Sequence, residues 1–262
     1  MTRIIRAELV RLARRRTMVL AAAGSLLFAT VATLAVFSSA QASSAPRARG
    51  AATLDALAKS GGGTEAFAVG ASFAGFLVFV TFIALLAGEF SGGTFRALLL
   101  RDPHRLRLIV GKLAGALLVA AAVVALAEAF TFLVSLAVYP TKGIATSAWF
   151  NLDSLVAGLG HYATVMAGVA GWAVFGTTLA VILRSVPVAL GVGFAWAGPF
   201  ESSVVDSWST GYRFFPGQVL ASLVQGGTPE LGMGRAVVTA TLYAAVAAAV
   251  TLVLVSRRDV TS

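Results

Sequence analysis

The side chains of this chain that could do chemistry are few, and they are gathered in a small number of places. Of its 262 residues, 58% are hydrophobic and only 12% are charged, about half the charged fraction of an ordinary soluble domain. The densest interior block of charge is GEFSGGTFRALLLRDPHRLRLIVGKLAG, from Gly88 to Gly115, between two long apolar runs. One further acid, Glu128, stands alone inside an apolar run.

The residue sets on which most enzymes depend are missing. The chain has no cysteine, which excludes thiol nucleophiles and cysteine metal sites. Its two histidines form no H-E-x-x-H zinc helix, and no serine stands beside a histidine in a recognisable nucleophile elbow. The string Gly111-Lys112-Leu113 lacks the hydroxyl residue and the upstream glycine of a phosphate-binding loop. We therefore expect a chain that is not an enzyme, holds no metal and has no ATPase motif of its own.

Glu128 lies near the middle of its apolar run, in VVALAEAFTFL. A charge at that depth in a membrane costs about 2.5–3.5 kcal/mol, so the side chain should face the bundle interior or water, or be protonated. Two interpretations stay open. Glu128 is a proton or cation site on a transport path, or it makes an interhelical hydrogen bond to a Thr or Ser of a neighbouring helix.

Six apolar runs must position these residues. Runs of about 20 apolar residues cross a hydrocarbon core of about 30 Å as helices, because lipid offers no partner for unpaired backbone groups. The fifth run is the shortest, because Gly198-Pro199 and Glu201 interrupt it. The sequence predicts an all-α integral membrane protein, a single domain over residues 1–262, with six spans: 18–37, 67–87, 113–138, 162–183, 187–197 and 236–255.

The distribution of Lys and Arg predicts the orientation. Fourteen of the 20 basic residues fall on the face that would hold both termini and the 88–112 loop, and six on the other. Basic residues mark cytoplasmic loops, so both termini are expected in the cytoplasm. The net charge of +9 then belongs to membrane flanks, and we expect no nucleic-acid binding.

The segment before the first span predicts a short amphipathic helix on the cytoplasmic membrane surface. Ile5, Leu9 and Leu12 fall at i, i+4 and i+7, with arginines around the rest of the turn. The same arginines are also explained as a basic flank that sets topology. Ala40-Gln41-Ala42 resembles a signal-peptidase site, but the apolar run before it is longer than a signal-peptide core.

The outer segment over residues 200–234 is long and partly apolar. Val219, Leu220, Leu223 and Val224 form a stripe at helical spacing, which predicts a partly inserted helix on the outer side. An ordinary external loop is the alternative.

The 88–112 loop has the pattern of a folded elbow. Gly92-Gly93 permit a sharp turn after Glu89. Thr94 is then expected to cap a short helix with Phe95, Leu98 and Leu99 on one face. Asp102-Pro103 is a strong start signal for the next helix, which carries Arg105, Arg107 and Lys112 into the third span. A loop that only sets topology would need no such structure.

This loop resembles the cytoplasmic loop of type-2 ATP-binding-cassette (ABC) exporter permeases. The matching positions are Glu89, Gly93-Thr94, Arg96, Leu98-Leu99, Pro103, Arg105 and Gly111-Lys112-Leu113. The resemblance elsewhere is architectural: an amphipathic N-terminal helix, six spans and a long outer segment before the sixth.

The resemblance implies a permease subunit of a bacterial inner (plasma) membrane exporter. Such a subunit forms a homo- or heterodimer and binds separate ATPase subunits, which carry ATP and magnesium, through this loop. The residues expected to couple the two are Glu89, Thr94, Arg96, Asp102, Pro103 and Arg105. The second and fifth spans are expected to line the dimer interface.

Two other functions stay open. An ion-coupled secondary carrier would use Glu128, although the paired broken helices of such carriers are not seen in the sequence. A non-transporting membrane scaffold or immunity subunit is the third possibility. No residue specifies the transported substrate.

Overall fold

The computed structural model describes residues 1–40, 53–100 and 104–257, so Asp102, Pro103 and residues 41–52 of the expected first outer segment lie outside the described residues. Within these ranges the chain is all-α. Five of the described helices are long and apolar enough to cross a membrane: α2 (Arg15–Ser39), α4 (Gly62–Ser91), α6 (Arg105–Val138), α7 (Leu152–Leu183) and α11 (Met233–Arg257). Each contains one of the predicted runs, and only the fifth run has no helix of this length.

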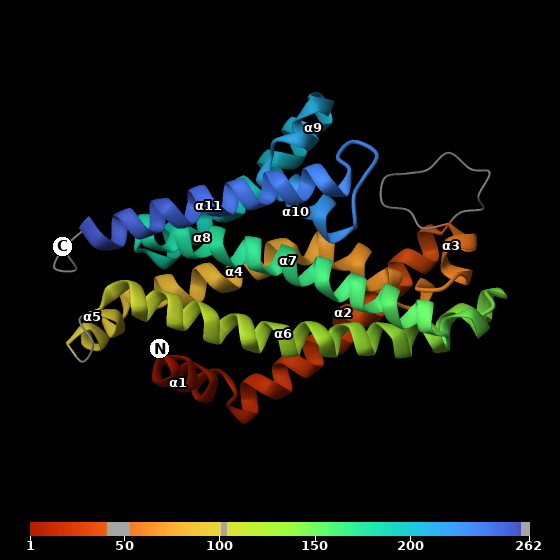
Figure 1. Cartoon of the computed structure of the whole chain (residues 1–262), viewed down its shortest axis with the longest axis horizontal. Coiled ribbons are helices and arrows are strands. Elements are labelled where there is room, and N and C mark those ends of the chain that lie inside the picture. The colour runs from red at the N-terminus through yellow and green to blue at the C-terminus, as the bar shows by residue number, and fades with distance from the viewer. Residues whose placement is uncertain (41–52, 101–103, 258–262) are drawn as a thin grey trace.

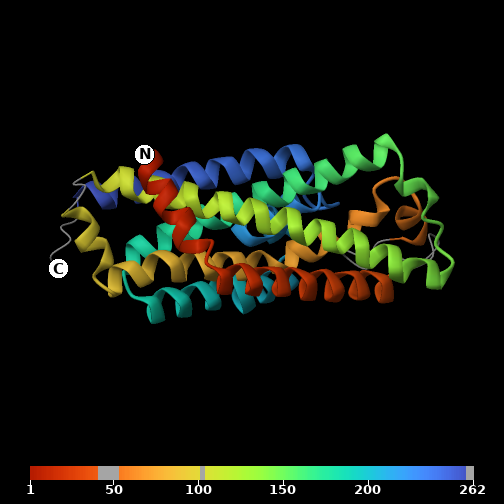
Figure 2. The same ribbon diagram turned by 90° about the horizontal axis from the view of Figure 1, so that it is seen from below.

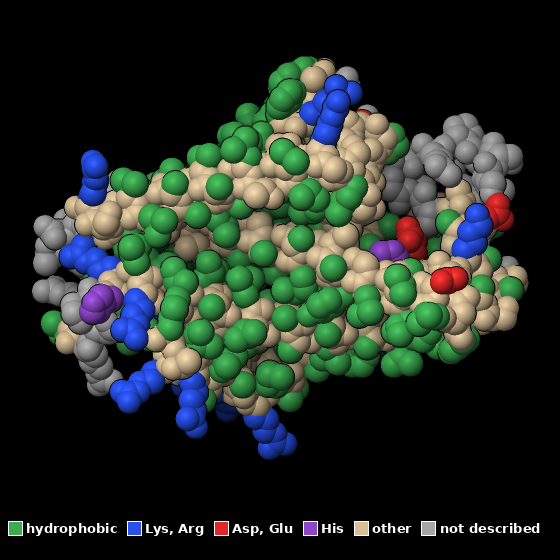
Figure 3. Space-filling model, viewed as in Figure 1, with side chains coloured by type: hydrophobic (Ala, Val, Ile, Leu, Met, Phe, Trp, Pro, Cys, Tyr) green, Lys and Arg blue, Asp and Glu red, His purple; other side chains and the backbone are tan. Residues whose placement is uncertain are grey.

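The five long helices run side by side along the long axis of the molecule (Figures 1 and 2). At one end lie α5 (Thr94–Leu99), the start of α6 and the end of α11. Lys and Arg side chains gather at this end, while apolar side chains cover the middle of the bundle (Figure 3). We call it the basic end. The opposite end carries α3 (Leu54–Ala58) and the turn between α6 and α7.

The helix α1 (Thr2–Leu12) lies across α6 at the basic end, at an angle to the bundle (Figure 2). The predicted amphipathic helix is therefore confirmed as a helix. Its apolar residues Ile5, Leu9 and Leu12 are half-buried. Leu12 packs against the core that α6 helps to form. The apolar face of α1 is therefore buried at least in part against the bundle.

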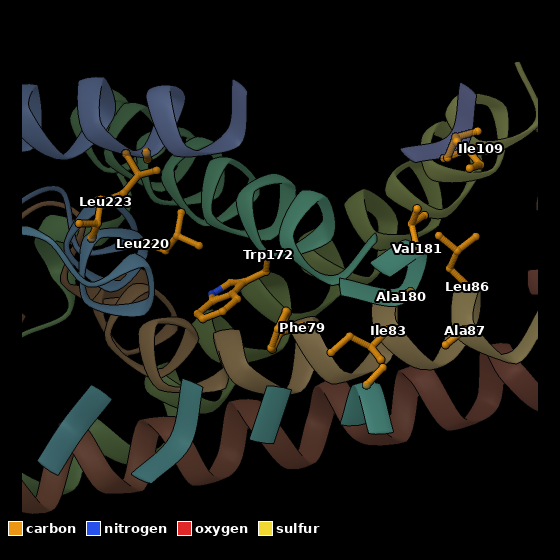
Figure 4. Packing of buried hydrophobic residues seen from close by; sticks show 14 of the residues in the cluster. Phe79, Ile83, Leu86, Ala87, Ile109, Trp172, Ala180, Val181, Leu220 and Leu223 are labelled. Carbon is orange, nitrogen blue, oxygen red and sulfur yellow. The ribbon is translucent and has the colours of Figure 1, made fainter. Parts of the chain in front are cut away.

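The central helix of the bundle is α7. In its most apolar stretch 61% of the residues are buried, against 11% in α6 and in α11. It packs most extensively on α4, where the rings of Phe79 and Trp172 lie 5.1 Å apart (Figure 4). Gly75 faces the Trp172 indole so closely that a Cβ there would overlap it. Small residues at this interface let the two backbones approach, as in other membrane bundles.

The predicted fifth span is shorter and more bent than expected. Its regular part, α8, covers only Val186–Ala195. The prediction that Gly198-Pro199 and Glu201 end the helix was wrong, because one π-helical turn (Trp196–Phe200) continues it into α9 (Glu201–Ser207). Proline has no backbone N–H to donate, and a wider turn is one way in which a helix passes such a residue. The helix then turns away from the bundle (Figure 1).

The helix predicted in the long outer segment is present as α10 (Pro216–Val224). Val219, Leu220, Leu223 and Val224 are all buried, where α10 packs against α4, α7 and α11. Glu201 is also buried, and its Oε1 accepts a hydrogen bond of 3.3 Å from the N–H of Gly217 in the first turn of α10. The apolar stripe thus inserts into the bundle, and Glu201 ties α9 to it.

Candidate functional site

The elbow at the basic end is a folded unit made from the end of α4, α5 and the start of α6. Gly93 has a φ of 70° and reverses the chain after α4, a conformation that glycine adopts at little cost. The helix α5 follows, and Phe95 is buried against Phe90 of α4, with ring centroids 4.6 Å apart. The guanidinium of Arg184, at the end of α7, lies 5.9 Å from the centre of the Phe90 ring. The elbow therefore touches α7 as well as the helices it joins.

The predicted caps of the elbow are not those of the structure. α5 begins at Thr94 itself, so Thr94 is the first helical residue instead of the cap before it, and its side chain is exposed. The residue before α6 is His104, without a side-chain cap, and α6 begins at Arg105. Asp102 and Pro103, predicted to start this helix, lie outside the described residues. The expected apolar face is confirmed: Phe95 is buried, and Leu98 and Leu99 are half-buried.

Four charged side chains meet beside the elbow, and we call them the four-charge cluster: Glu8 and Arg11 of α1, Glu89 of α4 and Lys112 of α6. The Lys112 Nζ lies 2.6 Å from Glu89 Oε1 and 3.3 Å from Glu8 Oε2. The Arg11 guanidinium lies 2.7 Å from Glu89 Oε1 and also pairs with Glu8. Both glutamates are at most 5% exposed. Three helices are thus joined by two acids and two bases of balanced charge.

Close packing of α1 on α6 creates this cluster. Gly111 and Gly115, one turn apart on α6, face Ile4 and Glu8, one turn apart on α1. A Cβ on Gly111 would lie 2.8 Å from Ile4 Cγ2, and one on Gly115 would lie 2.8 Å from Glu8 Cβ. Only glycine permits this approach, which places Glu8 within reach of Lys112.

A small, partly open cavity of about 20 Å³ lies beside the cluster, with room for about one water molecule. Two buried polar atoms of the cluster, Arg11 Nε and Glu89 Oε2, have no hydrogen-bond partner in the described part of the chain. Both residues line the cavity, as does Thr177 of α7. A water molecule there would satisfy polar atoms that the protein leaves open.

The predicted coupling residues separate into different environments. Glu89 is buried in the cluster instead of emerging at the surface. Thr94 is exposed on α5. The side chain of Arg96 lies outside the described residues, although its backbone belongs to α5. Arg105 is half-buried and its Nη1 donates a hydrogen bond of 3.5 Å to the carbonyl of Val255, near the end of α11. Arg105 therefore links α6 to α11.

Glu8 and Arg11 were missed by the sequence analysis. A signal was available, because Glu8 is the sole acid in the first 54 residues and stands among six arginines. Its spacing from Arg11 is also that of a helical ion pair. What the spacing could not reveal is that the pair faces Glu89 and Lys112, which are distant in sequence.

A second polar group lies at the opposite end, where Thr64 and Glu65 of α4, Glu128 of α6 and His161 of α7 converge. Thr64 Oγ1 and His161 Nδ1 lie 2.8 Å apart, and His161 Nε2 lies 3.6 Å from Glu65 Oε2. A Cβ placed on Gly158 would lie 3.6 Å from Glu128 Oε1 and 3.9 Å from Thr64. We call these four residues the opposite-end polar group.

Glu128 lies near the first turn of α4, where Thr64 and Gly158 are its neighbours. Its Oε1 is buried and has no hydrogen-bond partner in the described ranges. The expected hydrogen bond to a neighbouring Thr or Ser is thus not formed by this atom, even though Thr64 is near. No group of three or more His, Cys, Asp or Glu suited to a metal ion is found in the described part of the chain.

Comparison with known proteins gives one family and no named relative. No curated protein matches the chain. A family model described as a protein of unknown function, DUF2705, matches residues 53–261. The match includes α4, α5 and α6, and it excludes α1 and α2. Because it covers most of the chain, the chain belongs to the DUF2705 family.

Proposed function

We propose that this chain is the membrane-spanning permease subunit of an ATP-driven exporter of the type-2 ABC class. A separate ATPase subunit binds ATP and magnesium and docks on the elbow, and a second permease subunit completes the path. In this proposal the basic end faces the cytoplasm, and α8 with its π turn forms the fifth of six crossings of a bacterial inner membrane.

The observation that carries the proposal is that the elbow is in contact with α4, with α6 and with the end of α7. α5 is a short, exposed helix whose one buried anchor, Phe95, packs against Phe90 and thereby approaches Arg184 of α7. At the elbow's two roots, Glu89 and Lys112 pair with each other. Force applied to α5 would therefore reach α4, α6 and α7 together.

The coupling residues take two roles in this mechanism. Thr94 and Arg96 lie on α5. Together with Asp102 and Pro103, which follow them in the sequence, they would contact the ATPase. Glu89 and Arg105 act within the permease, because Glu89 joins the four-charge cluster and Arg105 binds the end of α11. Closure of the ATPases on ATP would push α5 and tilt the helices rooted at the elbow.

The proposal expects an ATPase gene beside the gene of this chain, and co-purification of the two proteins tests it. We expect the two proteins to purify together and the ATPase rate to rise when the pair is placed in lipid. Arg96→Glu should weaken the association and make it more sensitive to salt, as reversal of an interface charge does. Arg235→Glu in α11 is the matched control. Normal membrane levels of the chain with no ATPase bound under any condition would contradict the proposal.

The expected orientation can be tested separately, because the chain has no cysteine. Single cysteines at Thr94 and at Asn151 mark the two ends of the bundle, and both positions are exposed. A membrane-impermeant maleimide added outside intact cells should label Asn151→Cys and not Thr94→Cys. Labelling of Thr94→Cys and not of Asn151→Cys would show that the orientation is the opposite of the expected one.

A secondary carrier is the second candidate, and the buried Oε1 of Glu128 favours it. Acids inside a membrane commonly mark a pathway for protons, ions or substrates. In a carrier, transport by the purified chain in vesicles would follow an ion gradient without ATP, and Glu128→Gln would abolish it. In the exporter, Glu128→Gln would leave ATP-driven transport largely intact.

A further inference from the structure

A polar groove of about 310 Å³ lies between the first turns of α1 and α6 at the basic end. Its lining consists of Met1, Thr2, Arg3, Ile4 and Arg107. Two of these residues are arginines from different helices, and both are exposed. The groove is separate from the four-charge cluster, which shares none of its lining residues.

The packing that forms the four-charge cluster also brings these two arginines to the same groove. Ile4 is seated on Gly111, and this contact holds Arg3 and Arg107 beside the same groove. Neither arginine has an ion-pair partner in the described part of the chain. Two arginines on one groove make it positively charged, which favours an anion there.

The positive charges of Arg3 and Arg6 in the first half of α1 do not stabilise the helix. The first turn of a helix favours acids, because the helix dipole is positive there. α1 has no acid in its first turn, and Arg3 and Arg6 lie in its first half. Arg11, by contrast, turns inward and pairs with Glu8 and Glu89. The outward arginines therefore point to a partner outside the chain.

The position of the groove indicates a membrane lipid as that partner. Arg107 lies six residues before Leu113, where the apolar run of α6 begins, and six residues of helix span about 9 Å. The headgroup layer on each side of the hydrocarbon core is about 5–8 Å thick, so the backbone of Arg107 lies at its outer edge. Exposed Arg14, Arg15 and Arg16 lie between α1 and the apolar part of α2, at the same boundary.

We propose that the groove binds the phosphate of an anionic phospholipid headgroup between Arg3 and Arg107. A guanidinium offers two parallel N–H donors that match a phosphate group. The lipid would neutralise the two arginines and fasten α1 to the bundle at the membrane surface. This inference does not depend on the proposed transport function, and its test contains no ATPase.

Lipid binding by the detergent-solubilised chain tests the proposal, for example by native mass spectrometry with phosphatidylglycerol or phosphatidylcholine. We expect the wild-type chain to retain phosphatidylglycerol in preference to phosphatidylcholine. Arg3→Gln with Arg107→Gln should weaken phosphatidylglycerol binding on the order of 30-fold, because the double variant removes two charge-assisted contacts to the phosphate in the groove. Both residues are exposed, so the variant should melt at the wild-type temperature.

Arg14→Gln with Arg15→Gln is the matched control, because it removes the same charge outside the groove and should retain the lipid. The proposal would be overturned if this control lost as much phosphatidylglycerol binding, or if phosphatidylcholine bound equally well. Either result would mean that the groove is not a specific site for an anionic lipid. Inorganic phosphate distinguishes a lipid from a free anion. If phosphate alone binds the groove and displaces phosphatidylglycerol, the groove is a site for free phosphate and the lipid proposal fails.

Discussion

The four-charge cluster and the opposite-end polar group differ in how their charged side chains are paired. In the four-charge cluster at the basic end, two acids and two bases pair across three helices. In the opposite-end polar group, Thr64 and His161 bind each other, while Glu128 Oε1 is buried without a hydrogen-bond partner among the described residues. The first arrangement fastens helices together. The second leaves an acid available for a proton, an ion or a water molecule.

The largest effect on stability is expected when only one charge of the Glu89–Lys112 pair is removed. Glu89→Gln or Lys112→Met alone leaves a buried charge uncompensated, and each should lower the free energy of unfolding by about 3 kcal/mol. The double variant should lose clearly less than the sum, since it removes both charges. Unfolding of the detergent-solubilised chain measures the coupling, with the exposed Lys59→Met as control. Additive losses would show that the two residues do not interact.

A smaller loss of stability is expected when the close contact between α1 and α6 is disturbed. Gly115→Ala places a methyl group against Glu8, and overpacking of this kind costs about 1–3 kcal/mol. The control is Gly88→Ala in α4, where a Cβ would meet no atom within 4 Å, so stability should stay equal or rise. The two variants carry the same change of one methyl group in a helix. Equal behaviour in a thermal melt would refute the close contact.

A smaller effect again is expected at the opposite end from Thr64→Ala. The variant removes the hydrogen bond to His161 and should cost about 1 kcal/mol, the usual contribution of one hydrogen bond. Thr210→Ala, at an exposed position, is the control. No difference between the two variants in unfolding experiments would mean that the Thr64–His161 bond contributes nothing to stability.

The smallest effect on stability is expected from Glu128→Gln, because no hydrogen bond of the buried Oε1 is lost. The free energy of unfolding should not fall, and any change should be an increase, since a buried acid in a membrane is itself unfavourable. A fall as large as that of Glu89→Gln would show that Glu128 is held by an interaction, and the contrast between the two sites would disappear.

The long helices could be predicted because their signal is local. An apolar run of about 20 residues has few alternatives in a membrane, and the runs at 67–87 and 162–183 lie within α4 and α7. The inserted helix α10 was predictable for the same reason, since Val219 and Leu223 repeat at helical spacing. The π turn at Trp196–Phe200 was not, because Gly-Pro in a sequence indicates an end of the helix more often than a wider turn.

The four-charge cluster could be predicted only in part. Glu89 and Lys112 flank the elbow and were noticed in the sequence, but their partners depend on where α1 lies in three dimensions. That position depends on Gly111 and Gly115, whose role becomes visible only when Ile4 and Glu8 are seen against them. The neighbours of Glu128 could not be predicted from its own apolar run, because Thr64 and Gly158 come from two other helices.

The central claim, that a partner ATPase docks on the elbow, is tested most directly by site-specific cross-linking in this cysteine-free chain. A photoreactive maleimide on Thr94→Cys should cross-link the ATPase, and the same probe on the exposed Asp153→Cys at the opposite end should not. Addition of ATP should change the yield at Thr94 only. Equal yields at the two positions, or none at Thr94 while the ATPase remains bound, would contradict the account.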